Sequence, residues 1–283
     1  MGGWTRPVTA AVAAAALMSS VAACGGDDDD AGGDSTTTST TRAMTYTAEA
    51  GPDHEVDGGW RQGLARVEGG WVFSTNNGLY TTGEDFVQTG GRGDVIPADL
   101  AAQSYDHVGD IDIADGVLWA PIEQPSRAGP QVIARYDAET LEYVSSEEVD
   151  QRHAAWVAVD GDVVYSMDEF DEEDTVARYR WTGERLEPDE PLQMSRSLTR
   201  IQGGDVADGA LWLSTDDDEN GLFRVDLASG EVTDLGSAGR PDGEGEGIDA
   251  DDDSPDTLLH VLVADAAIVP MWVTGFTVTA TPA

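Results

Sequence analysis

Two histidines and two arginines stand at related positions of the chain and could handle a proton or an anion. Arg61, His107 and Arg200 each lie nine residues before a glycine. His153 lies eight residues before another, one residue out of this register. Histidine changes charge near neutral pH, and arginine offers forked N–H donors to carboxylates and phosphates. If the fold brings these positions together, they form a ring for an anionic or hydroxylated ligand. In the alternative interpretation they bond to backbone between repeats and only hold the structure together.

Carboxylates accompany this ring. Glu244 or Glu246 would complete it from the last repeat. A second group of aspartates consists of candidate calcium ligands, namely Asp110, Asp112, Asp205 and Asp249. Calcium takes six to eight oxygen ligands, which carboxylates converging from several repeats could supply. Against this, an acidic chain offers carboxylates everywhere, and strand alternation can point Asp110 and Asp112 into solvent.

Composition excludes several classes of function. The 283 residues carry 55 Asp and Glu against 15 basic residues, all of them arginine, and the formal net charge is −40. Nucleic-acid binding is a poor hypothesis for such a chain, since a polyanion needs a basic patch. The absence of lysine removes Schiff-base chemistry and a phosphate-loop lysine. A single cysteine excludes an intramolecular disulfide and any multi-cysteine metal site.

A repeat must position these residues. Aromatic residues recur at Phe73, Trp119, Tyr165 and Trp212, at spacings of 46, 46 and 47 residues, and a further 48 residues lead to His260. Strands with alternating apolar and polar residues end in the dipeptides Asp115-Gly116, Asp160-Gly161 and Asp208-Gly209. Asp-Gly suits a two-residue hairpin turn, because such a turn needs positive φ. With little helical periodicity between these marks, the pattern predicts an all-β protein, a β-propeller of four-stranded antiparallel blades.

The repeat also predicts the number of blades and where binding occurs. We expect five blades over residues 44–283, or six if Met44–Asp57 and the tail beyond Ala264 form more than closing strands. The first-to-second turns are alike and share one end of the propeller. The loops of the other end differ among repeats, at Glu123–Pro130, Met167–Asp174 and Thr215–Gly221. Variation confined to one end is where repeat proteins usually place binding.

Some segments resemble known blade repeats. Leu222-Phe223-Arg224-Val225-Asp226, followed by Ser229-Gly230-Glu231 and Glu246-Gly247-Ile248, is similar to the repeats of YVTN-type, gluconolactonase-type and phytase-like esterase propellers. The resemblance covers most of residues 60–264. It implies the propeller fold and, through the gluconolactonase- and phytase-like members, bound calcium. One fold hosts many functions, so it implies less about activity.

The N-terminal segment has the pattern of a lipoprotein signal. Val8–Met18 is an apolar run, too short to span a bilayer, and Val21-Ala22-Ala23-Cys24 resembles a bacterial lipobox. We therefore expect a signal peptide over residues 1–23 and lipid attachment, palmitate included, at Cys24. An acidic and Ser/Thr-rich tether would follow over residues 24–43. The protein would be exported and anchored to the outer face of the cell membrane, or the periplasmic side, with only its lipid touching the membrane.

Two hypotheses for function follow. In the first, the propeller is a tethered module that binds a small ligand or a protein through its variable loops. In the second, it is a calcium-assisted hydrolase of lactones, esters or phosphoesters at the central channel. The sequence contains no Gly-x-Ser-x-Gly or His-Glu-x-x-His motif. This absence favours the binding module.

Overall fold

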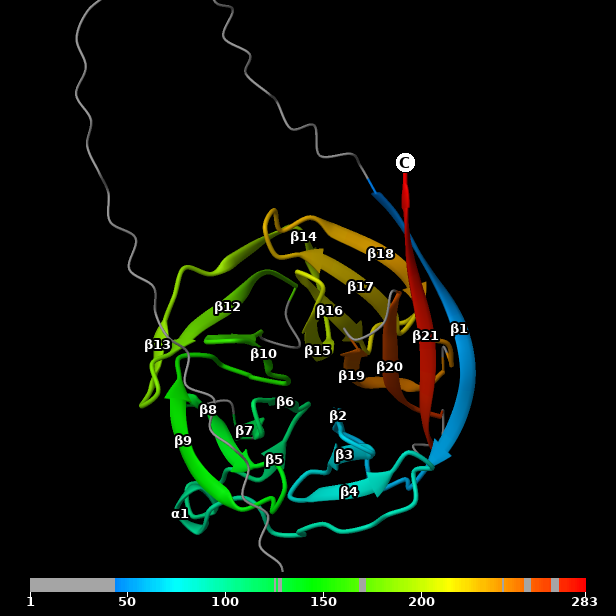
Figure 1. Cartoon of the computed structure of the whole chain (residues 1–283). Helices are drawn as coiled ribbons and strands as arrows, with labels where there is room; N and C mark the ends of the chain where they lie inside the picture. The colour runs from blue at the N-terminus through cyan, green and yellow to red at the C-terminus, as the bar shows by residue number, and fades with distance from the viewer. Residues whose placement is uncertain are drawn as a thin grey trace, which may run out of the picture. The chain divides into compact units, whose positions relative to one another are not determined.

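The computed structural model describes residues 44–124, 126, 129–167, 172–240, 242–251, 256–265 and 270–283. The predicted signal peptide, Cys24 and the tether lie outside these residues. The described chain forms five antiparallel sheets arranged around a common centre, which confirms the predicted β-propeller (Figure 1). A single short helix among the described residues, α1 (Ala98–Ala101), lies between the first two blades in sequence.

Each blade runs from an inner strand at the centre to an outer strand. Blade 1 contains β2 (Gly63–Val67), β3 (Gly70–Ser74) and β4 (Leu79–Gly83), and residues 88–92 bridge to β4 as a short fourth strand. Blade 2 has a divided inner strand, β5 (His107–Val108) and β6 (Asp112–Ala114), followed by β7 (Val117–Glu123), β8 (Gln131–Asp137) and β9 (Tyr143–Val149). Blade 3 has a divided outer strand and contains β10 (Ala158–Asp160), β11 (Val163–Ser166), β12 (Glu173–Trp181), β13 (Leu186–Pro188) and β14 (Leu192–Leu198).

The last two blades are regular. Blade 4 contains β15 (Ile201–Ala207), β16 (Ala210–Thr215), β17 (Gly221–Asp226) and β18 (Val232–Ser237). Blade 5 contains β19 (Glu244–Asp251), β20 (Thr257–Ala264) and β21 (Met271–Pro282), with the N-terminal β1 (Met44–Val56) as its outer strand. β1 pairs with β21 from Met44 opposite Pro282 to Val56 opposite Met271. Both ends of the domain are therefore closing strands, and the number of blades is five. No helix in the described ranges is long and apolar enough to cross a membrane.

Of the three predicted Asp-Gly turns, two form as predicted and one is displaced by a residue. Asp115-Gly116 and Asp208-Gly209 adopt positive φ at both residues, as the Asp-Gly pattern predicts. In blade 3 the prediction was wrong by one residue: Asp160 pairs with Val163, so the turn is Gly161-Asp162. In blade 1 the turn glycine is Gly69, because Val67 pairs with Gly70. The spacing thus predicts the number of blades, but the exact positions of the turns follow only from the paired strands.

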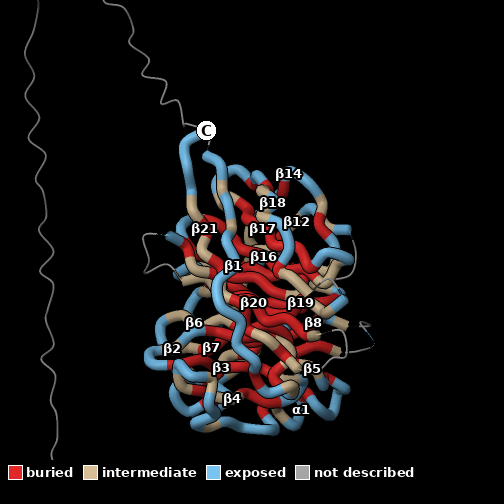
Figure 2. The backbone as a smooth tube through the Cα atoms, turned by 90° about the vertical axis from the view of Figure 1, so that its right-hand side faces the viewer, coloured by how far each residue is buried: buried red, intermediate tan, exposed pale blue. Residues whose placement is uncertain are grey.

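The core lies between neighbouring blades. The aromatic residues that marked the repeat, Phe73, Trp119, Tyr165 and Trp212, all lie in second strands and are buried. Figure 2 shows this buried interior beside the exposed course of β1. Burial of large apolar side chains against the next blade is the main favourable term in stability.

Asp110 joins the inner strands at the centre. It is fully buried, and its Oδ1 accepts hydrogen bonds from the backbone N–H of Leu64 in blade 1 (3.2 Å) and of Ile111 (3.0 Å). Its Oδ2 accepts from the N–H of Gly204 in blade 4 and of Ile248 in blade 5, both at 3.2 Å. One carboxylate from blade 2 therefore holds three other blades, since a buried N–H needs an acceptor.

Blade 3 meets Asp110 through the backbone, and glycines allow the approach on the other sides. The N–H of Asp110 donates to the carbonyl of Ala155 (2.8 Å), and its own carbonyl accepts from Val157 (3.3 Å). A Cβ added at Gly63 or Gly247 would come within 2.3 Å of Asp110 Oδ1. Inner strands with side chains at these two positions could not close around the carboxylate.

We expect Asp110→Ala to lower the free energy of unfolding by at least about 4 kcal/mol, because four buried N–H groups lose their acceptor at roughly 1–3 kcal/mol each. Asp110→Asn keeps one acceptor oxygen and should lose less. The exposed Asp160, at the end of β10, provides the control Asp160→Ala, with a change below about 0.5 kcal/mol. Urea denaturation of the three variants measures these effects. Equal stability of Asp110→Ala and wild type would contradict this role.

Candidate ligand-binding site

The pairing of the strands places two of the predicted ring residues, His107 and Arg200, at equivalent positions, whereas Arg61 lies one residue out of this register because Val67 ends the inner strand of blade 1. His107 pairs with Glu123 at the start of blade 2, and the N–H of Asp216 donates to the carbonyl of Arg200 at the start of blade 4. In blade 5 the equivalent first pair is Glu244 with Ala264. Glu244 therefore stands in the ring register. We call this end of the inner strands the mouth.

Glu246 lies deeper than Glu244. It falls in the irregular stretch of β19 between Gly245 and Ile248 and is 3 % exposed. Its carbonyl accepts a hydrogen bond from the Ser214 hydroxyl (2.5 Å). The extra residue in β19 shifts the register here, which the spacing of the repeat does not reveal.

Two side-chain contacts with glutamates connect neighbouring blades at the mouth. Arg61 Nη2 lies 3.3 Å from Glu244 Oε2 between blades 1 and 5, and both side chains are about one-third exposed, at 31 % and 38 %. His153 Nδ1 lies 3.0 Å from Glu123 Oε1 between blades 3 and 2, and both are buried. The N–H of Ala154 also donates to Glu123 Oε1 (2.7 Å). These contacts join neighbouring blades through glutamate side chains rather than through the backbone of the alternative interpretation, and the Arg61–Glu244 pair stays partly open to solvent.

His107 belongs to the same group, whereas Arg200 lies with a different partner. Burial lowers the pKa of His107; Glu123 opposes this, and the charges of His153 and Arg61 add to it. His107 thus lies within electrostatic reach of both. Arg200 pairs with Asp216 of its own blade. The sequence did not single out Glu123 or Asp216 as site residues; each lies opposite a ring residue, so pairing of the second strand would have found them.

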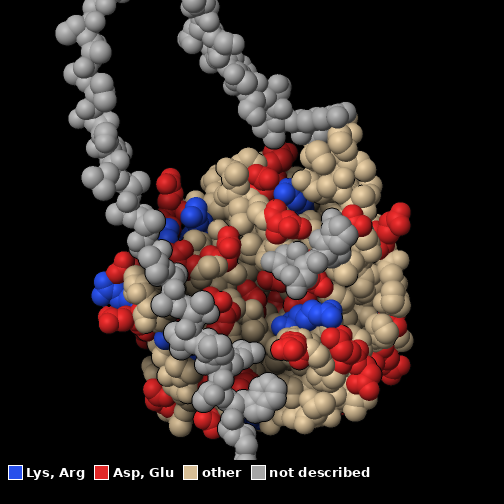
Figure 3. All heavy atoms as spheres, in the orientation of Figure 1, with Lys and Arg blue, Asp and Glu red and all other residues tan. Residues whose placement is uncertain are grey.

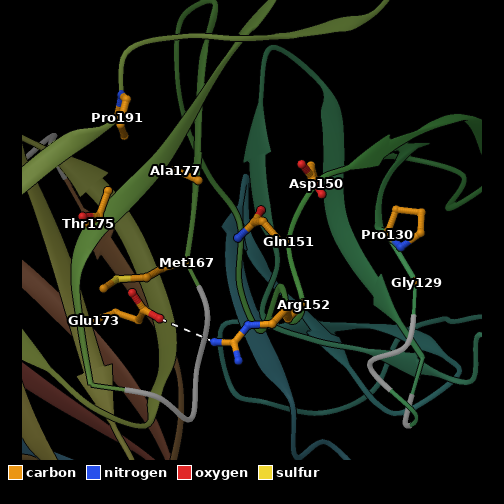
Figure 4. A pocket seen from close by; sticks show the side chains of 10 residues that line it. All are labelled: Gly129, Pro130, Asp150, Gln151, Arg152, Met167, Glu173, Thr175, Ala177 and Pro191. Atoms are coloured by element: carbon orange, nitrogen blue, oxygen red, sulfur yellow. Dashed lines mark ion pairs between the residues drawn. The ribbon is translucent and has the colours of Figure 1, made fainter.

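A hollow opens beside this group, between blades 2 and 3. Its volume is about 660 Å³, and it is lined by Gly129, Pro130, Asp150, Gln151, Arg152, Met167, Glu173, Thr175, Ala177 and Pro191. Figure 4 shows Arg152 and Glu173 pointing toward one another, and their charged atoms lie 3.7 Å apart. Gln151 Nε2 donates to the carbonyl of His153, which ties the hollow to the mouth (3.4 Å). The described parts of two variable loops, 129–130 and 167 with 173, thus border one polar hollow.

The aspartates predicted to bind calcium bind backbone N–H groups. One oxygen of each accepts from the next blade, with Asp112 accepting from Val159 (2.6 Å), Asp205 from Ala250 (2.6 Å) and Asp249 from Arg66 (2.7 Å). Asp110 accepts from four such donors, so it does not face solvent as alternation allowed. Among the described residues, no three His, Cys, Asp or Glu side chains are placed to hold a metal ion. The donor sets at these four aspartates fit blade-to-blade contacts rather than a calcium site.

Burial alters the titration of these carboxylates. It raises the pKa of Asp112 to about 7, and the charge of Asp249 adds to this, while the N–H bonds from Val159 and Ile113 act in the opposite direction. The pKa of Asp205 is raised by burial and by the charges of Asp112 and Asp249. Burial also raises the pKa of Asp110, against four N–H bonds that favour its ionised form. The three channel aspartates, Asp112, Asp205 and Asp249, thus repel one another when ionised.

We expect Asp112 to make stability depend on pH. Its folded pKa of about 7 lies above the ordinary value of 3.8, so the folded chain binds this proton more tightly. The stabilisation is complete below about pH 4 and is lost as the pH rises through about 7. In Asp112→Asn, the slope of unfolding free energy between those values should flatten by up to about 1.4 kcal/mol per pH unit. Urea melts across this range measure the slope, with Asp160→Asn as control. Parallel curves for Asp112→Asn and wild type would exclude this assignment.

No protein-family model and no curated protein matches the sequence. Among solved structures, the chain is similar to a glutaminyl cyclase of Myxococcus xanthus, with a TM-score of 0.62 and 10 % identity over 84 % of this chain and 98 % of that one. It is also similar to a gluconolactonase of Xanthomonas campestris, with a TM-score of 0.49 and 14 % identity over 78 % and 87 % of the two chains. The similarity to the cyclase shows that the two proteins share the propeller fold.

Proposed function

We propose that the chain is a binding module that takes a small anionic or hydroxylated ligand at the mouth and the adjoining hollow. The observation that carries this proposal is the 660 Å³ hollow, which adjoins the ring of charged side chains through Gln151 and His153. A concave site with a few convergent polar groups is the usual form of a small-molecule site. The alternative function is that the same loops bind a protein partner.

Arg61 is the residue that we assign to an anionic group of the ligand. Its Nε is buried and has no hydrogen-bond partner within the described part of the chain, although its Nη2 contacts Glu244. Buried N–H groups normally find an acceptor, so an anion or hydroxyl at the mouth would complete this donor. Figure 3 shows carboxylates spread over the visible face with few basic side chains among them. In such a field, an arginine with an unsatisfied donor is a selective point for an anion.

The hollow supplies groups for hydroxyls. Asp150 and Glu173 can accept hydrogen bonds, and Thr175 can both donate and accept. Gln151 is held by the Tyr179 hydroxyl, which donates to its Oε1 (3.2 Å), so its amide is fixed beside the hollow. A polyhydroxylated ligand would find several partners here without any large movement.

No contact favours the hydrolase hypothesis specifically. The carboxylates that would hold a metal accept backbone N–H bonds. The glutaminyl cyclase is an enzyme by name, but a shared propeller fold does not transfer activity. The binding role needs only the groups described above.

A thermal-shift screen of anionic and polyhydroxylated compounds tests the proposed site. A ligand at about 100 times its Kd adds about 2.7 kcal/mol and should raise the Tm of the full chain by roughly 5–10 °C. Arg61→Gln and Gln151→Ala should reduce that shift. Arg196→Gln, an exposed arginine that pairs with Asp234, is the matched control. A ligand whose shift survives both site substitutions would place binding elsewhere.

We also propose that the protein is exported and anchored by lipid at Cys24, on the outer face of the cell membrane or the periplasmic side. The support is the apolar run Val8–Met18 followed by Val21-Ala22-Ala23-Cys24, which contains the lone cysteine of the chain. Lipidation that adds two or more acyl chains gives stable attachment to a bilayer.

Cys24→Ser should abolish incorporation of radiolabelled palmitate in cells and move the protein from the membrane fraction to the soluble fraction. Ser19→Ala, in the same segment, should leave both unchanged. Fractionation and gel autoradiography measure the two outcomes. Labelling that persists in Cys24→Ser would show that the lipid, if any, is attached elsewhere.

A further inference from the structure

A second hollow lies between blades 5 and 1, at the end of the propeller that carries the tight turns. Its volume is about 300 Å³. It is lined by Gly51, Pro52, His54, Arg66, Trp71 and Glu84, and by Phe86, Leu258, Leu259, His260, Gly275, Phe276 and Thr277. We call it the inter-blade slot. It shares no lining residue with the hollow between blades 2 and 3.

Two glycines form the floor of the slot. A Cβ added at Gly275 in β21 would meet no described atom within 4 Å. Gly51 lies where β1 shifts register against β21, between Ala50 and Asp53. Farther along the same two blades, Leu262, Met271 and Val273 belong to a buried cluster with Trp71 and Phe73. The interface between these blades is therefore filled by apolar side chains on one side of the slot, and the space beside Gly275 contains no side chain of its own.

Four rings form the walls. Trp71 and Phe86 of blade 1 are stacked, with centroids 5.7 Å apart and planes at 19°. His260 of blade 5 presents its ring edge-on to Trp71 at 4.6 Å, and His54 of β1 lies 5.1 Å from Phe86. Rings from both blades thus surround a space floored by backbone. Flat aromatic ligands gain most in such a space, because stacked and edge-on ring contacts add to the burial of area.

Phe86 is held in its place by an unusual backbone conformation. Its φ is +59°, in the left-handed region that costs a residue with a side chain about 1 kcal/mol. Its N–H donates to the carbonyl of Gly83 (3.0 Å), and the N–H of Gly83 donates to Val87 (3.0 Å), which closes the turn around it. This turn places a half-buried phenyl ring between Trp71 and His54. Strain that positions a partly exposed ring at a hollow points to binding.

The polar groups of the slot are few. Arg66 lies over Trp71, with its guanidinium carbon 5.0 Å from the ring centroid, and its Nη2 lies 3.3 Å from the carboxylate of Glu84. Glu84 is 55 % exposed at the rim and can accept a further hydrogen bond. The slot therefore combines aromatic walls with an accessible carboxylate at its rim.

We infer that the inter-blade slot binds a small planar aromatic molecule that carries one hydrogen-bond donor, such as a phenol or an indole. Its ring lies on the floor at Gly275 against Phe86 and Trp71, and its O–H or N–H donates to Glu84. The slot is lined mainly by aromatic rings, whereas the mouth and its hollow offer charged side chains and the amide of Gln151 to a polar ligand. The two sites lie at opposite ends of the blades, so both can be filled at once.

Saturation-transfer NMR with p-cresol on the full chain tests this inference. We expect wild type to bind p-cresol more tightly than cyclohexanol, which also carries a hydroxyl group but has no aromatic ring. Phe86→Leu should weaken binding about 3- to 10-fold, the loss expected for one aromatic contact. Gly275→Val should abolish it, because the added side chain fills the floor. Gln151→Ala, in the other hollow, should leave the affinity for p-cresol unchanged, which separates this site from the one under "Proposed function".

Thermal melts control for folding. Gly275→Val should melt within a few degrees of wild type, since its Cβ would meet no described atom within 4 Å and a β-branched residue suits a strand. If that variant does not fold, Gly275→Ala adds only the Cβ and should weaken binding with its melt unchanged. The inference is overturned if wild type does not bind p-cresol in the millimolar range, if cyclohexanol binds equally well, or if folded Gly275 variants keep wild-type affinity.

Discussion

Asp110 accepts hydrogen bonds from the inner strands of blades 1, 4 and 5 with one buried carboxylate, while its backbone pairs with blade 3. This arrangement constrains the backbone of the other inner strands. The inner strands of blades 1, 4 and 5 must each bring a backbone N–H to within hydrogen-bond reach of the same two oxygens, and glycines stand at Gly63 and Gly247, where a side chain would collide. On their side toward the centre these inner strands have no further strand to pair with. The Asp110 carboxylate accepts the N–H groups that would otherwise be unpaired there.

With the centre occupied by a side chain and its donors, ligands approach this fold at the two ends or between the blades. The charged residues at the mouth lie at one end, and the inter-blade slot lies between two blades. At the mouth, Arg61 and Glu244 join blades 1 and 5 through charges that stay partly in water. At the slot, the same two blades part around bare backbone at Gly275. The interface between blades 1 and 5 is thus closed in its middle by apolar packing. One of its ends is charged and the other is lined by aromatic rings.

Much of the architecture was predictable because the repeat acts through local and periodic signals. The spacing of Trp119, Tyr165 and Trp212 gave the blade length, and Asp115-Gly116 marked its turn, since each reflects one strand or hairpin. The site was predictable only in part. Equivalent positions brought His107 and His153 near Glu123, but the spacing left Glu244 and Glu246 as alternatives, and only the strand pairing places Glu244 in the ring register. The acceptor role of Asp110 depends on N–H groups that are 46, 94 and 138 residues away, which no local pattern contains.

The pairing of Met44 with Pro282 has a topological consequence. The Cα atoms of antiparallel partners lie about 5 Å apart, so the chain enters and leaves the propeller at nearly the same point. A domain of this kind can be inserted into a surface loop of a host protein without forcing the two flanks apart. Equally, a short linker could join its ends, and a circularly permuted chain opened at another blade would then retain every strand of blade 5 as one covalent unit.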